Sequence, residues 1–311
     1  MTKKFTLPAF AKVNLSLRVL GRRADGYHEI STVFQTITLH DRLTFEELTG
    51  GRIELVCAAP DIPVDESNLV RRAATALREH FGGDARGARI ELEKKIPAGG
   101  GLGGGSSDAA VALLGLSHLW EIKTCKSELA EIGARLGADV PYFFTGGRAL
   151  GTGTGTEIAP LEDVPEEHFL VVTPGVKVST AEAYKALNAP ALTKAGSAVM
   201  LPISHTEGQT SDSLHELMRN DFETVVFGLH PEIERARKAL LAQGARASLL
   251  SGSGSSVFGV FDQGDEAARA CVALRAEARW EVSACSTLSR SEYRKAFGRC
   301  GAMLQDAADE N

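Results

Sequence analysis

The sequence has no run of 18 apolar residues and no CxxC pair among its cysteines, and each absence excludes a class of protein. Without such a run, no helix is long enough to cross a membrane. The first residues, MTKKFTLPAF, lack the apolar stretch of a signal peptide. Five cysteines, an odd number, fit free thiols in a reducing compartment better than a disulfide framework or a zinc site. We therefore expect a cytoplasmic protein with no membrane contact.

Positive charge is also scarce. The 34 lysines and arginines are outnumbered by 40 aspartates and glutamates, which gives a formal net charge of −6. Nucleic-acid binding usually needs a basic face, so we expect no nucleic-acid partner. With 311 residues, of which 43% are hydrophobic, the chain can bury two ordinary cores. We expect two domains, 1–162 and 163–311, which meet near the segment from Pro160 to Pro165.

Glycine is abundant, and its densest stretch is the most informative part of the chain. From Gly99 to Ala110 the sequence reads GGGLGGGSSDAA. Glycine lets backbone N–H groups turn inward around an anion, and a following helix offers its positive end. The alternating segment before it, 90–96, predicts a strand, and Ser106, Ser107 and Asp108 predict the start of a helix. A strand, a glycine loop and a helix together predict a phosphate site, with a flexible linker as the alternative.

The remaining patterns predict a mixture of strands and helices. In the first half we expect strands at 13–19, 29–39, 42–46 and 52–57, helices from the Asn68 cap to Phe81 and from Ser127 to Gly137, and a glycine-rich strand pair at 146–155. In the second half we expect a strand at 169–173, a helix opened by Ser179, an irregular loop at 189–212, helices at about 213–227 and 231–243, two strands within 247–261, a helix at 265–278 and a strand at 281–286. The second half therefore predicts a split βαβ domain of the ferredoxin-like kind.

The glycine loop does not fit the two best-known nucleotide motifs. No lysine follows the glycines, as a Walker A motif requires, and no acidic residue stands in the context of a Rossmann fingerprint. The segment from Pro97 to Ala110 instead resembles the Pro-x-x-x-Gly-Leu-Gly-x-x-Ser-Ser-x-Ala-Ala motif of the GHMP small-molecule kinases.

Four further segments resemble one branch of these kinases. PAFAKVNL at 8–15 and GRRADGYH at 21–28 are similar to the N-terminal signature of the 4-diphosphocytidyl-2-C-methyl-D-erythritol kinase family. LGADVP at 136–141 and LSGSGSS at 250–256 follow in the family's order, so the resemblance covers about residues 8 to 290. The chain departs from the family at Phe10, which widens the Pro-Ala-Lys spacing, and at Gly151, where alanine is more usual.

The resemblance implies both a fold and a reaction. The implied fold class is α+β, a two-domain GHMP kinase fold with an N-terminal ribosomal-protein-S5-like domain and a C-terminal ferredoxin-like domain. The implied reaction transfers the γ-phosphate of ATP to the 2-hydroxyl of 4-diphosphocytidyl-2-C-methyl-D-erythritol, in the mevalonate-independent route to isoprenoid precursors. ATP and Mg²⁺ are thus expected, with the ion held by phosphates and water because no cluster of residues has metal-ligand spacing. The expected partner is a small molecule with a cytidine diphosphate moiety, and the protein is expected to be a monomer or a weak homodimer.

Two residues are the predicted catalytic groups. Asp139 lies between Gly137 and Pro141, on a short and stiff connection, where a carboxylate can accept the proton of a substrate hydroxyl. Lys12 shares one side of the first strand with Asn14, because side chains alternate along a strand. The resemblance implies that Lys12 lies next to Asp139, where an ammonium would stabilise developing negative charge. The alternative interpretations are a loop-capping carboxylate and a solvated strand face.

The predicted substrate-binding residues are Asn14, Tyr27, His28, Thr180 and Tyr184. Tyr27 and His28 follow the turn Asp25-Gly26, which presents both rings at its exit. The resemblance implies that these two residues contact the cytosine and that Tyr184 closes over it from the other domain. By itself, His28 is compatible with an ordinary surface or core histidine.

The predicted ATP-binding residues form a larger set. The resemblance implies that Asn68 and Lys94 reach the adenine end of ATP. The phosphate-binding members are Pro97, Gly99, Gly100, Gly101, Leu102, Gly103, Gly104, Gly105, Ser106 and Ser107. A second glycine run, 251–256, is implied to lie on the substrate side of the phosphate path, and the alternative is a plain hairpin turn.

Three other functions remain open at this point. Another GHMP kinase, for homoserine or mevalonate, has no use for the aromatic pair in GRRADGYH. A catalytically silent binding protein on the same scaffold would not need Lys12, Asp139 and the glycine loop together. An RNA-binding module is disfavoured by the acidic balance and by the lack of an aromatic and basic strand surface.

Overall fold

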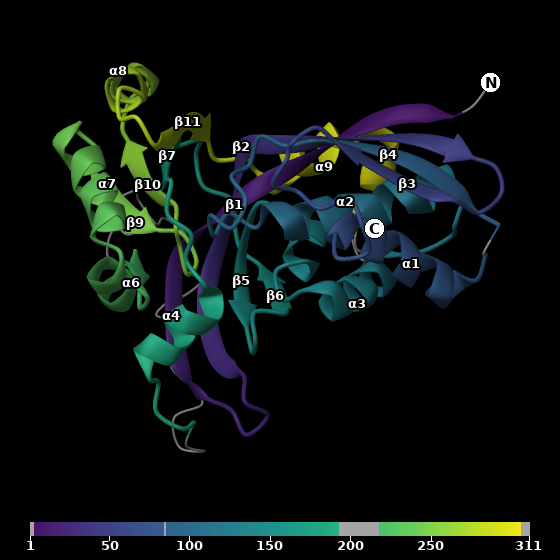
Figure 1. Cartoon of the computed structure of the whole chain (residues 1–311), viewed down its shortest axis with the longest axis horizontal. Helices are drawn as coiled ribbons and strands as arrows, with labels where there is room; N and C mark the ends of the chain where they lie inside the picture. The colour runs from purple at the N-terminus through teal and green to yellow at the C-terminus, as the bar shows by residue number, and fades with distance from the viewer. Residues whose placement is uncertain (1–2, 84, 193–217, 306–311) are drawn as a thin grey trace.

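The computed structural model describes residues 3–83, 85–192 and 218–305, and they form two lobes (Figure 1). The N-terminal lobe is built on a seven-stranded sheet and the C-terminal lobe on a four-stranded sheet. Helices cover both sheets, so the predicted two-domain α+β architecture is confirmed. Within the described ranges, no helix is long and apolar enough to cross a membrane.

The N-terminal sheet is organised by one long hairpin. Its strands are β1 (Lys4–Arg22), β2 (His28–Leu48), β3 (Ile53–Cys57), β4 (Gly87–Glu93), β5 (Arg148–Thr152), β6 (Glu157–Pro160) and β8 (Arg219–Asn220). The order is β3-β4-β2-β1-β8, with β5 on β2 and β6 on β5. The prediction of two strands at 29–39 and 42–46 is wrong: β2 runs unbroken, and residues 28–48 contain no glycine or proline that would end it.

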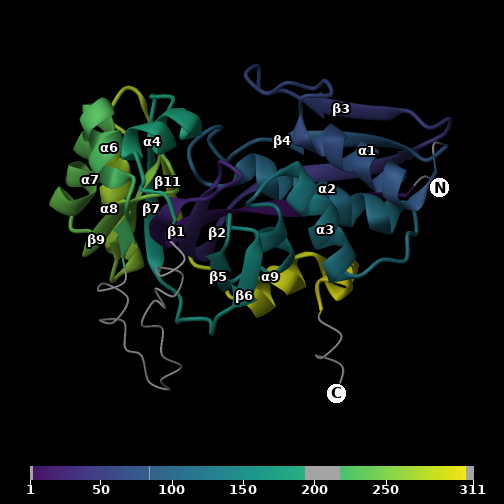
Figure 2. The same ribbon diagram turned by 90° about the horizontal axis from the view of Figure 1, so that it is seen from below.

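Helices α1 (Leu69–Phe81) and α2 (Gly104–Leu119) lie against this sheet, and α3 (Lys126–Leu136) packs on both of these helices (Figure 2). The α1 cap is as expected, since the Asn68 side chain accepts from the Val70 N–H at 2.9 Å. The predicted start of α2 at 106–108 is wrong. The helix begins two residues earlier, behind the left-handed Gly103. Ser107 and Asp108 are buried inside the helix, where packing outweighs their preference for caps. Helix α3 likewise begins one residue before Ser127, behind Cys125.

The C-terminal sheet has the strand order expected of a ferredoxin-like domain. Its strands β7 (His168–Pro174), β9 (Ala247–Leu250), β10 (Val257–Phe261) and β11 (Trp280–Ser286) pair in the antiparallel order β11-β7-β10-β9. Helices α6 (Glu223–Leu229), α7 (Pro231–Ala242) and α8 (Gly264–Leu274) lie on the outer side of this sheet (Figure 1). The short helix α4 (Thr180–Leu187) opens at Ser179 as expected, because the Ser179 hydroxyl accepts from the Glu182 N–H.

The predicted helix at 213–227 is wrong in its described part. Residues 219–220 form strand β8 beside β1, and α6 begins only at Glu223. The Asn220 side chain accepts from the Phe222 N–H at 2.9 Å. An asparagine that bonds to its own backbone in this way competes with helix formation. Residues 193–217, with most of the predicted 189–212 loop, and the tail after Asp306 lie outside the described residues.

A shared core joins the two lobes. Residues of β1 and β2, such as Val13 and Ile37, pack with Phe169 of β7 and Phe258 of β10, whose rings stack at 5.4 Å. The end of the chain also crosses over: helix α9 (Arg290–Ala296) and the 3₁₀ helix η2 (Gly298–Leu304) belong to the N-terminal core. The domain limits 1–162 and 163–311 stay a prediction, and this returning segment shows that the N-terminal core draws on both ranges.

Candidate active site

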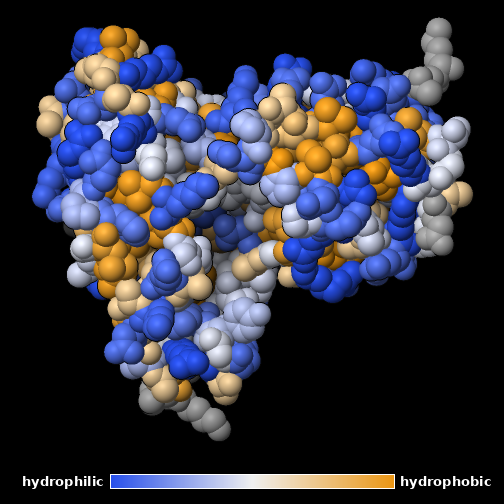
Figure 3. Space-filling model, in the orientation of Figure 1, coloured by the Kyte–Doolittle hydropathy of each residue, from blue (hydrophilic) through white to orange (hydrophobic). Residues whose placement is uncertain are grey.

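A cavity of about 1430 Å³ lies where the two lobes meet, and the surface is visibly hollowed there (Figure 3). It collects residues from seven separate parts of the sequence. The predicted catalytic and substrate-binding residues all line it: Lys12, Asn14, Tyr27, His28, Asp139, Thr180 and Tyr184. From the glycine loop, Gly101, Gly103 and Ser106 also line it. The glycine loop, an ion pair and a group of aromatic rings therefore line the same cavity.

Lys12 owes its position to an irregularity in strand β1. The register of β1 against β2 shifts between Phe10 and Lys12. The Lys12 N–H bonds instead to the carbonyl of Leu102 in the glycine loop, at 3.0 Å. Bulges of this kind redirect side chains and are common beside active sites. The irregularity that follows Phe10 thus ties the strand to the glycine loop.

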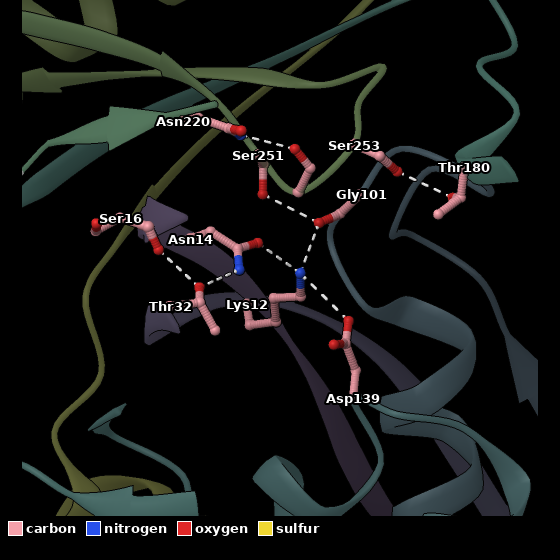
Figure 4. A network of polar contacts seen from close by, with 11 residues as sticks. Lys12, Asn14, Ser16, Thr32, Gly101, Asp139, Thr180, Asn220, Ser251 and Ser253 are labelled. Carbon is pink, nitrogen blue, oxygen red and sulfur yellow. Dashed lines mark hydrogen bonds and ion pairs between the residues drawn. The ribbon is translucent and has the colours of Figure 1, made fainter. Parts of the chain in front are cut away.

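The Lys12 ammonium is buried and surrounded by acceptors (Figure 4). Its Nζ donates to Asn14 Oδ1 at 2.7 Å and to the Gly101 carbonyl at 3.0 Å, and it lies 3.3 Å from Asp139 Oδ2. The ring of Phe34 lies 5.4 Å away. The side chain of Lys12 is 3% exposed and that of Asp139 is 34% exposed. The ammonium is therefore held in place, while the carboxylate keeps one side open to the cavity.

Asn14 is oriented by a chain of hydrogen bonds that leads away from the cavity. Its amide nitrogen donates to Thr32 Oγ1 at 2.7 Å, and the Thr32 hydroxyl donates to the Ser16 carbonyl at 2.6 Å. This chain leaves Asn14 Oδ1 facing Lys12. Neighbouring strands thus fix the amide before any ligand arrives, which is the arrangement expected of a preorganised site.

The glycine loop turns tightly between β4 and α2. Gly101 has a φ of +75°, which favours glycine, and its carbonyl points at Lys12. Helix α2 begins directly after Gly103, so its unpaired N–H groups and positive end lie beside the cavity. Glycine amides together with a helix N-terminus make a binding place for phosphate.

A buried charge cluster supports the loop from behind. The Lys94 ammonium bonds to the Asp41 carboxylate and, at 2.7 Å, to Asp108 Oδ2. The other Asp41 oxygen accepts from the backbone N–H groups of Lys95 and Ile96. Asp108 Oδ1 is buried and has no hydrogen-bond partner. Two carboxylates thus share one ammonium in the protein interior. When both carboxylates are ionised, the cluster carries one excess negative charge.

Replacing Asp108 by asparagine is expected to stabilise the protein at pH 8 and to have less effect at pH 5. Burial raises the pKa of the Asp108 carboxyl to about 7, against the lowering effect of Lys94 and with a further rise from Asp41. Because this pKa lies above that of the unfolded chain, the stability contributed by Asp108 falls as the pH rises from about 4 to about 7. We expect a gain on the order of 1 kcal/mol at pH 8, measured by urea unfolding at both pH values.

The matched control for this variant is Asp262→Asn, which removes an exposed carboxylate paired with Arg246. It should show no pH-dependent gain, because exposed ion pairs contribute little. A loss of stability in Asp108→Asn at pH 8 would show instead that Lys94 needs both carboxylates.

The aromatic residues lie at the other end of the cavity. The rings of His28 and Tyr184 stack at 4.6 Å with 21° between their planes, and Phe222 meets Tyr184 edge-on at 4.8 Å. Tyr27 is 67% exposed at the tip of the β1–β2 hairpin. Burial and the nearby Arg22 lower the pKa of His28, while burial and the Asp139 charge raise the pKa of Tyr184 to about 12. At neutral pH, Tyr184 is therefore a neutral ring that keeps its hydroxyl proton.

The two residues predicted at the adenine end have other partners. The Asn68 amide caps α1 and donates to the Pro63 carbonyl at 2.6 Å. Lys94 belongs to the charge cluster behind the loop. Their contact with adenine stays a prediction, as do the individual roles of the loop residues from Pro97 to Ser107.

Sequence reasoning missed several residues that build the site. Thr32 and Phe34 come from the middle of β2, and Asn220 comes from the two-residue strand β8. The β2 residues could have been found as neighbours of Lys12 once the hairpin register was known. Nothing in the sequence marks Asn220, because its role depends on a long-range strand pair.

Comparison with protein families matches two separate parts of the chain. Residues 68–147 match the family described as GHMP kinases N terminal domain. Residues 204–279 match the family described as GHMP kinases C terminal. The first range contains the glycine loop and Asp139, and the second contains the second glycine run.

Comparison with whole proteins is more specific. A 4-diphosphocytidyl-2-C-methyl-D-erythritol kinase of Syntrophotalea carbinolica is 40% identical over 274 residues, which cover 88% of this chain and 95% of that protein. A kinase of the same name from Geobacter sp. strain M21 is 40% identical over 92% of this chain and 100% of its own length. A crystal structure of 4-(cytidine 5'-diphospho)-2C-methyl-D-erythritol kinase superimposes with a TM-score of 0.74 at 37% identity and covers 90% of this chain and 99% of that one. The homoserine kinase of Cytophaga hutchinsonii shares the fold, with a TM-score of 0.65 at 20% identity over 93% and 96% of the two chains.

Proposed function

The chain belongs to the 4-diphosphocytidyl-2-C-methyl-D-erythritol kinases of the GHMP kinase family, and we propose that its junction cavity transfers the γ-phosphate of ATP to the 2-hydroxyl of that substrate. It is an ATP-dependent small-molecule kinase that acts in isoprenoid precursor synthesis. The observation that carries the proposal for the site is the pair of Lys12 and Asp139 beside the glycine loop. Phosphoryl transfer needs positioning, charge neutralisation and an oriented nucleophile, and this arrangement can supply all three.

In the proposed reaction, Asp139 orients the substrate hydroxyl and takes its proton. The hydroxyl oxygen forms a bond to the γ-phosphorus as the bond from that phosphorus to the β-phosphate oxygen breaks and ADP leaves. The acceptor is a tertiary alcohol and a poor nucleophile, so a fixed base and close alignment matter. The Lys12 ammonium lies 3.3 Å from the Asp139 carboxylate. It stabilises the negative charge that develops between the hydroxyl oxygen and the γ-phosphate during the transfer.

ATP is proposed to place its phosphates against the glycine loop and the start of α2. The loop residues Gly101, Gly103 and Ser106 face the cavity. The described residues hold no group of three or more histidines, cysteines or acidic residues suited to a metal ion. The Ser106 hydroxyl lines the cavity at the loop and is an oxygen donor of the kind that Mg²⁺ accepts, and phosphate and water oxygens would complete its coordination. Such an ion would neutralise charge on the β- and γ-phosphates.

The cytidine end of the substrate is proposed to enter between the hairpin tip and α4. Tyr27, His28 and Tyr184 offer ring faces for the base. Thr180 and Asn14 lie further along the cavity toward Lys12. The Thr180 hydroxyl is 2.9 Å from the Ser253 hydroxyl. The cavity therefore offers ring faces for the base at one place and the pair of Lys12 and Asp139 for the reacting hydroxyl at another.

Location and assembly stay proposals. The cysteine pattern favours a reducing cytoplasm, and we propose a monomer or a weak homodimer, which analytical ultracentrifugation would test. The proposed partner is the cytidine diphosphate substrate alone, without nucleic acid or membrane.

The test of the function is an ADP-release assay with three alcohols in parallel: the cytidine diphosphate substrate, mevalonate and homoserine. We expect turnover with the first alone, because only that substrate has a base for the aromatic residues. Turnover with homoserine alone would overturn the substrate assignment while leaving a kinase.

Replacing Tyr27 by alanine should raise KM for the cytidine substrate and leave kcat within about twofold. An aromatic contact contributes about 0.5–1.5 kcal/mol, which corresponds to roughly a three- to tenfold change in KM. Tyr27 is 67% exposed, so the fold should not suffer. Steady-state kinetics check the result, with Tyr27→Phe as the control that keeps the ring. An unchanged KM in Tyr27→Ala would place the base elsewhere.

A further inference from the structure

The carbonyl of Gly101 is the point where the two lobes meet the catalytic lysine (Figure 4). It accepts from Lys12 Nζ at 3.0 Å and from the Ser251 hydroxyl, also at 3.0 Å. A carbonyl oxygen has two lone pairs, so these two donors satisfy it. Lys12 belongs to the N-terminal lobe, whereas Ser251 follows strand β9 of the C-terminal lobe. One oxygen atom therefore connects the position of the lysine to the second lobe.

The approach of the second lobe at this point is very close. A Cβ placed on Gly101 would lie 2.1 Å from the Ser251 carbonyl. Next to it, the Ser256 N–H donates to the Gly100 carbonyl at 3.0 Å. The turn that carries Ser251 is itself fastened, because the Asn220 amide donates to the carbonyls of Leu250 at 2.9 Å and Gly252 at 2.7 Å. Ser251 is fully buried. The Ser251 hydroxyl is therefore held against the glycine loop by a turn that is itself fixed by hydrogen bonds.

The Lys12 ammonium has three N–H groups and three acceptors: Asn14 Oδ1, the Gly101 carbonyl and Asp139. Asn14 is fixed by its own hydrogen bonds, and Asp139 must be free to meet substrate. Of these three acceptors, the Gly101 carbonyl is the one that the second lobe contacts, through the Ser251 hydroxyl. Rotation of the Gly101 peptide would break one of the two hydrogen bonds that hold the ammonium beside Asp139.

We propose that Ser251 is a positioning residue for Lys12: its hydroxyl fixes the Gly101 peptide and thereby sets the distance between the Lys12 ammonium and Asp139. This inference rests on the proposed function of Lys12. Ser251 acts on the reaction through Lys12 and contributes little to the binding of either substrate. Its loss should accordingly appear in kcat more than in KM.

The test begins with Ser251→Ala, which removes only the hydroxyl. We expect kcat to fall about tenfold while KM for ATP and for the alcohol changes less than twofold. The matched control is Ser248→Ala in strand β9, since the Ser248 hydroxyl is buried and has no hydrogen-bond partner. This control should keep the wild-type kcat. Thermal melts of both variants, with assays run well below either midpoint, separate a fall in kcat from unfolding.

A double-mutant cycle then asks whether Ser251 acts through Lys12. In single-turnover assays on a Lys12→Met background, adding Ser251→Ala should change the rate less than twofold, because there is no ammonium left to position. An unchanged kcat in Ser251→Ala, an effect confined to KM, or a tenfold loss that persists on the Lys12→Met background would each overturn the proposal. Failure of the wild type to turn over the cytidine substrate would instead count against the proposed function, and the cycle can be run with any alcohol that the enzyme accepts.

Discussion

Replacing Asp139 by asparagine is expected to lower kcat by a factor on the order of 10² to 10⁴ and to leave ATP binding nearly intact. The amide matches the carboxylate in shape and can still accept a hydrogen bond from Lys12, 3.3 Å away. It cannot take the proton of the acceptor hydroxyl, and it cannot balance the buried ammonium. Kinetics give kcat, and titration calorimetry gives the affinity for ATP. The loss should fall on the chemical step because the loop amides that face the phosphates are unchanged.

The surface variant Asp265→Asn is the matched control for this experiment. Asp265 is an exposed carboxylate that pairs with Arg269 on α8 and does not line the cavity. It should keep the wild-type kcat. The free energy of unfolding should fall in Asp139→Asn, because the buried Lys12 ammonium loses the Asp139 carboxylate, so kinetics are measured well below the melting midpoint. Wild-type turnover in Asp139→Asn would remove Asp139 from its proposed role.

Local patterns predicted well those parts of the site that depend on neighbours in sequence. Alternation along β1 placed Lys12 and Asn14 on one side, and their side chains lie 2.7 Å apart. The Asn68 cap of α1 follows from asparagine's preference for that position. The start of α2 was misplaced for the opposite reason. Ser106–Asp108 are good caps, but burial of the whole helix carries it two residues further back, to Gly104.

Contacts between distant segments could not be read from the sequence. Strand β8 is two residues long, and it exists because Leu17 offers a partner 203 positions earlier than Asn220. The bond from Ser251 to the Gly101 carbonyl spans 150 positions and depends on how the lobes dock. The nearness of Lys12 to Asp139 was expected only through family resemblance. Patterns of two or four residues carry no information on such distances, because tertiary packing sets them.

Replacing Gly101 by alanine is expected to be the most disruptive single change in the loop. The backbone there has a φ of +75°, and the new Cβ would lie 2.1 Å from the Ser251 carbonyl and 3.0 Å from that of Gly254. Both neighbours are backbone atoms, so the second lobe has to shift. We expect a loss of about 2–4 kcal/mol in the free energy of unfolding, from left-handed strain together with overpacking. A shift of the loop would move the Gly101 carbonyl that holds Lys12, and should also lower kcat on the order of 10²-fold.

Gly99→Ala separates the two causes, because Gly99 has nearly the same φ of +69° but nothing within 4 Å of the added Cβ. This variant should lose only the strain, about 1–2 kcal/mol. Urea unfolding and steady-state kinetics of the two variants, measured side by side, therefore isolate the effect of lobe contact. If Gly101→Ala merely matched Gly99→Ala in both measurements, the close approach of Ser251 would not matter. The larger loss in Gly101→Ala would show that catalysis depends on how closely the second lobe packs against the phosphate loop.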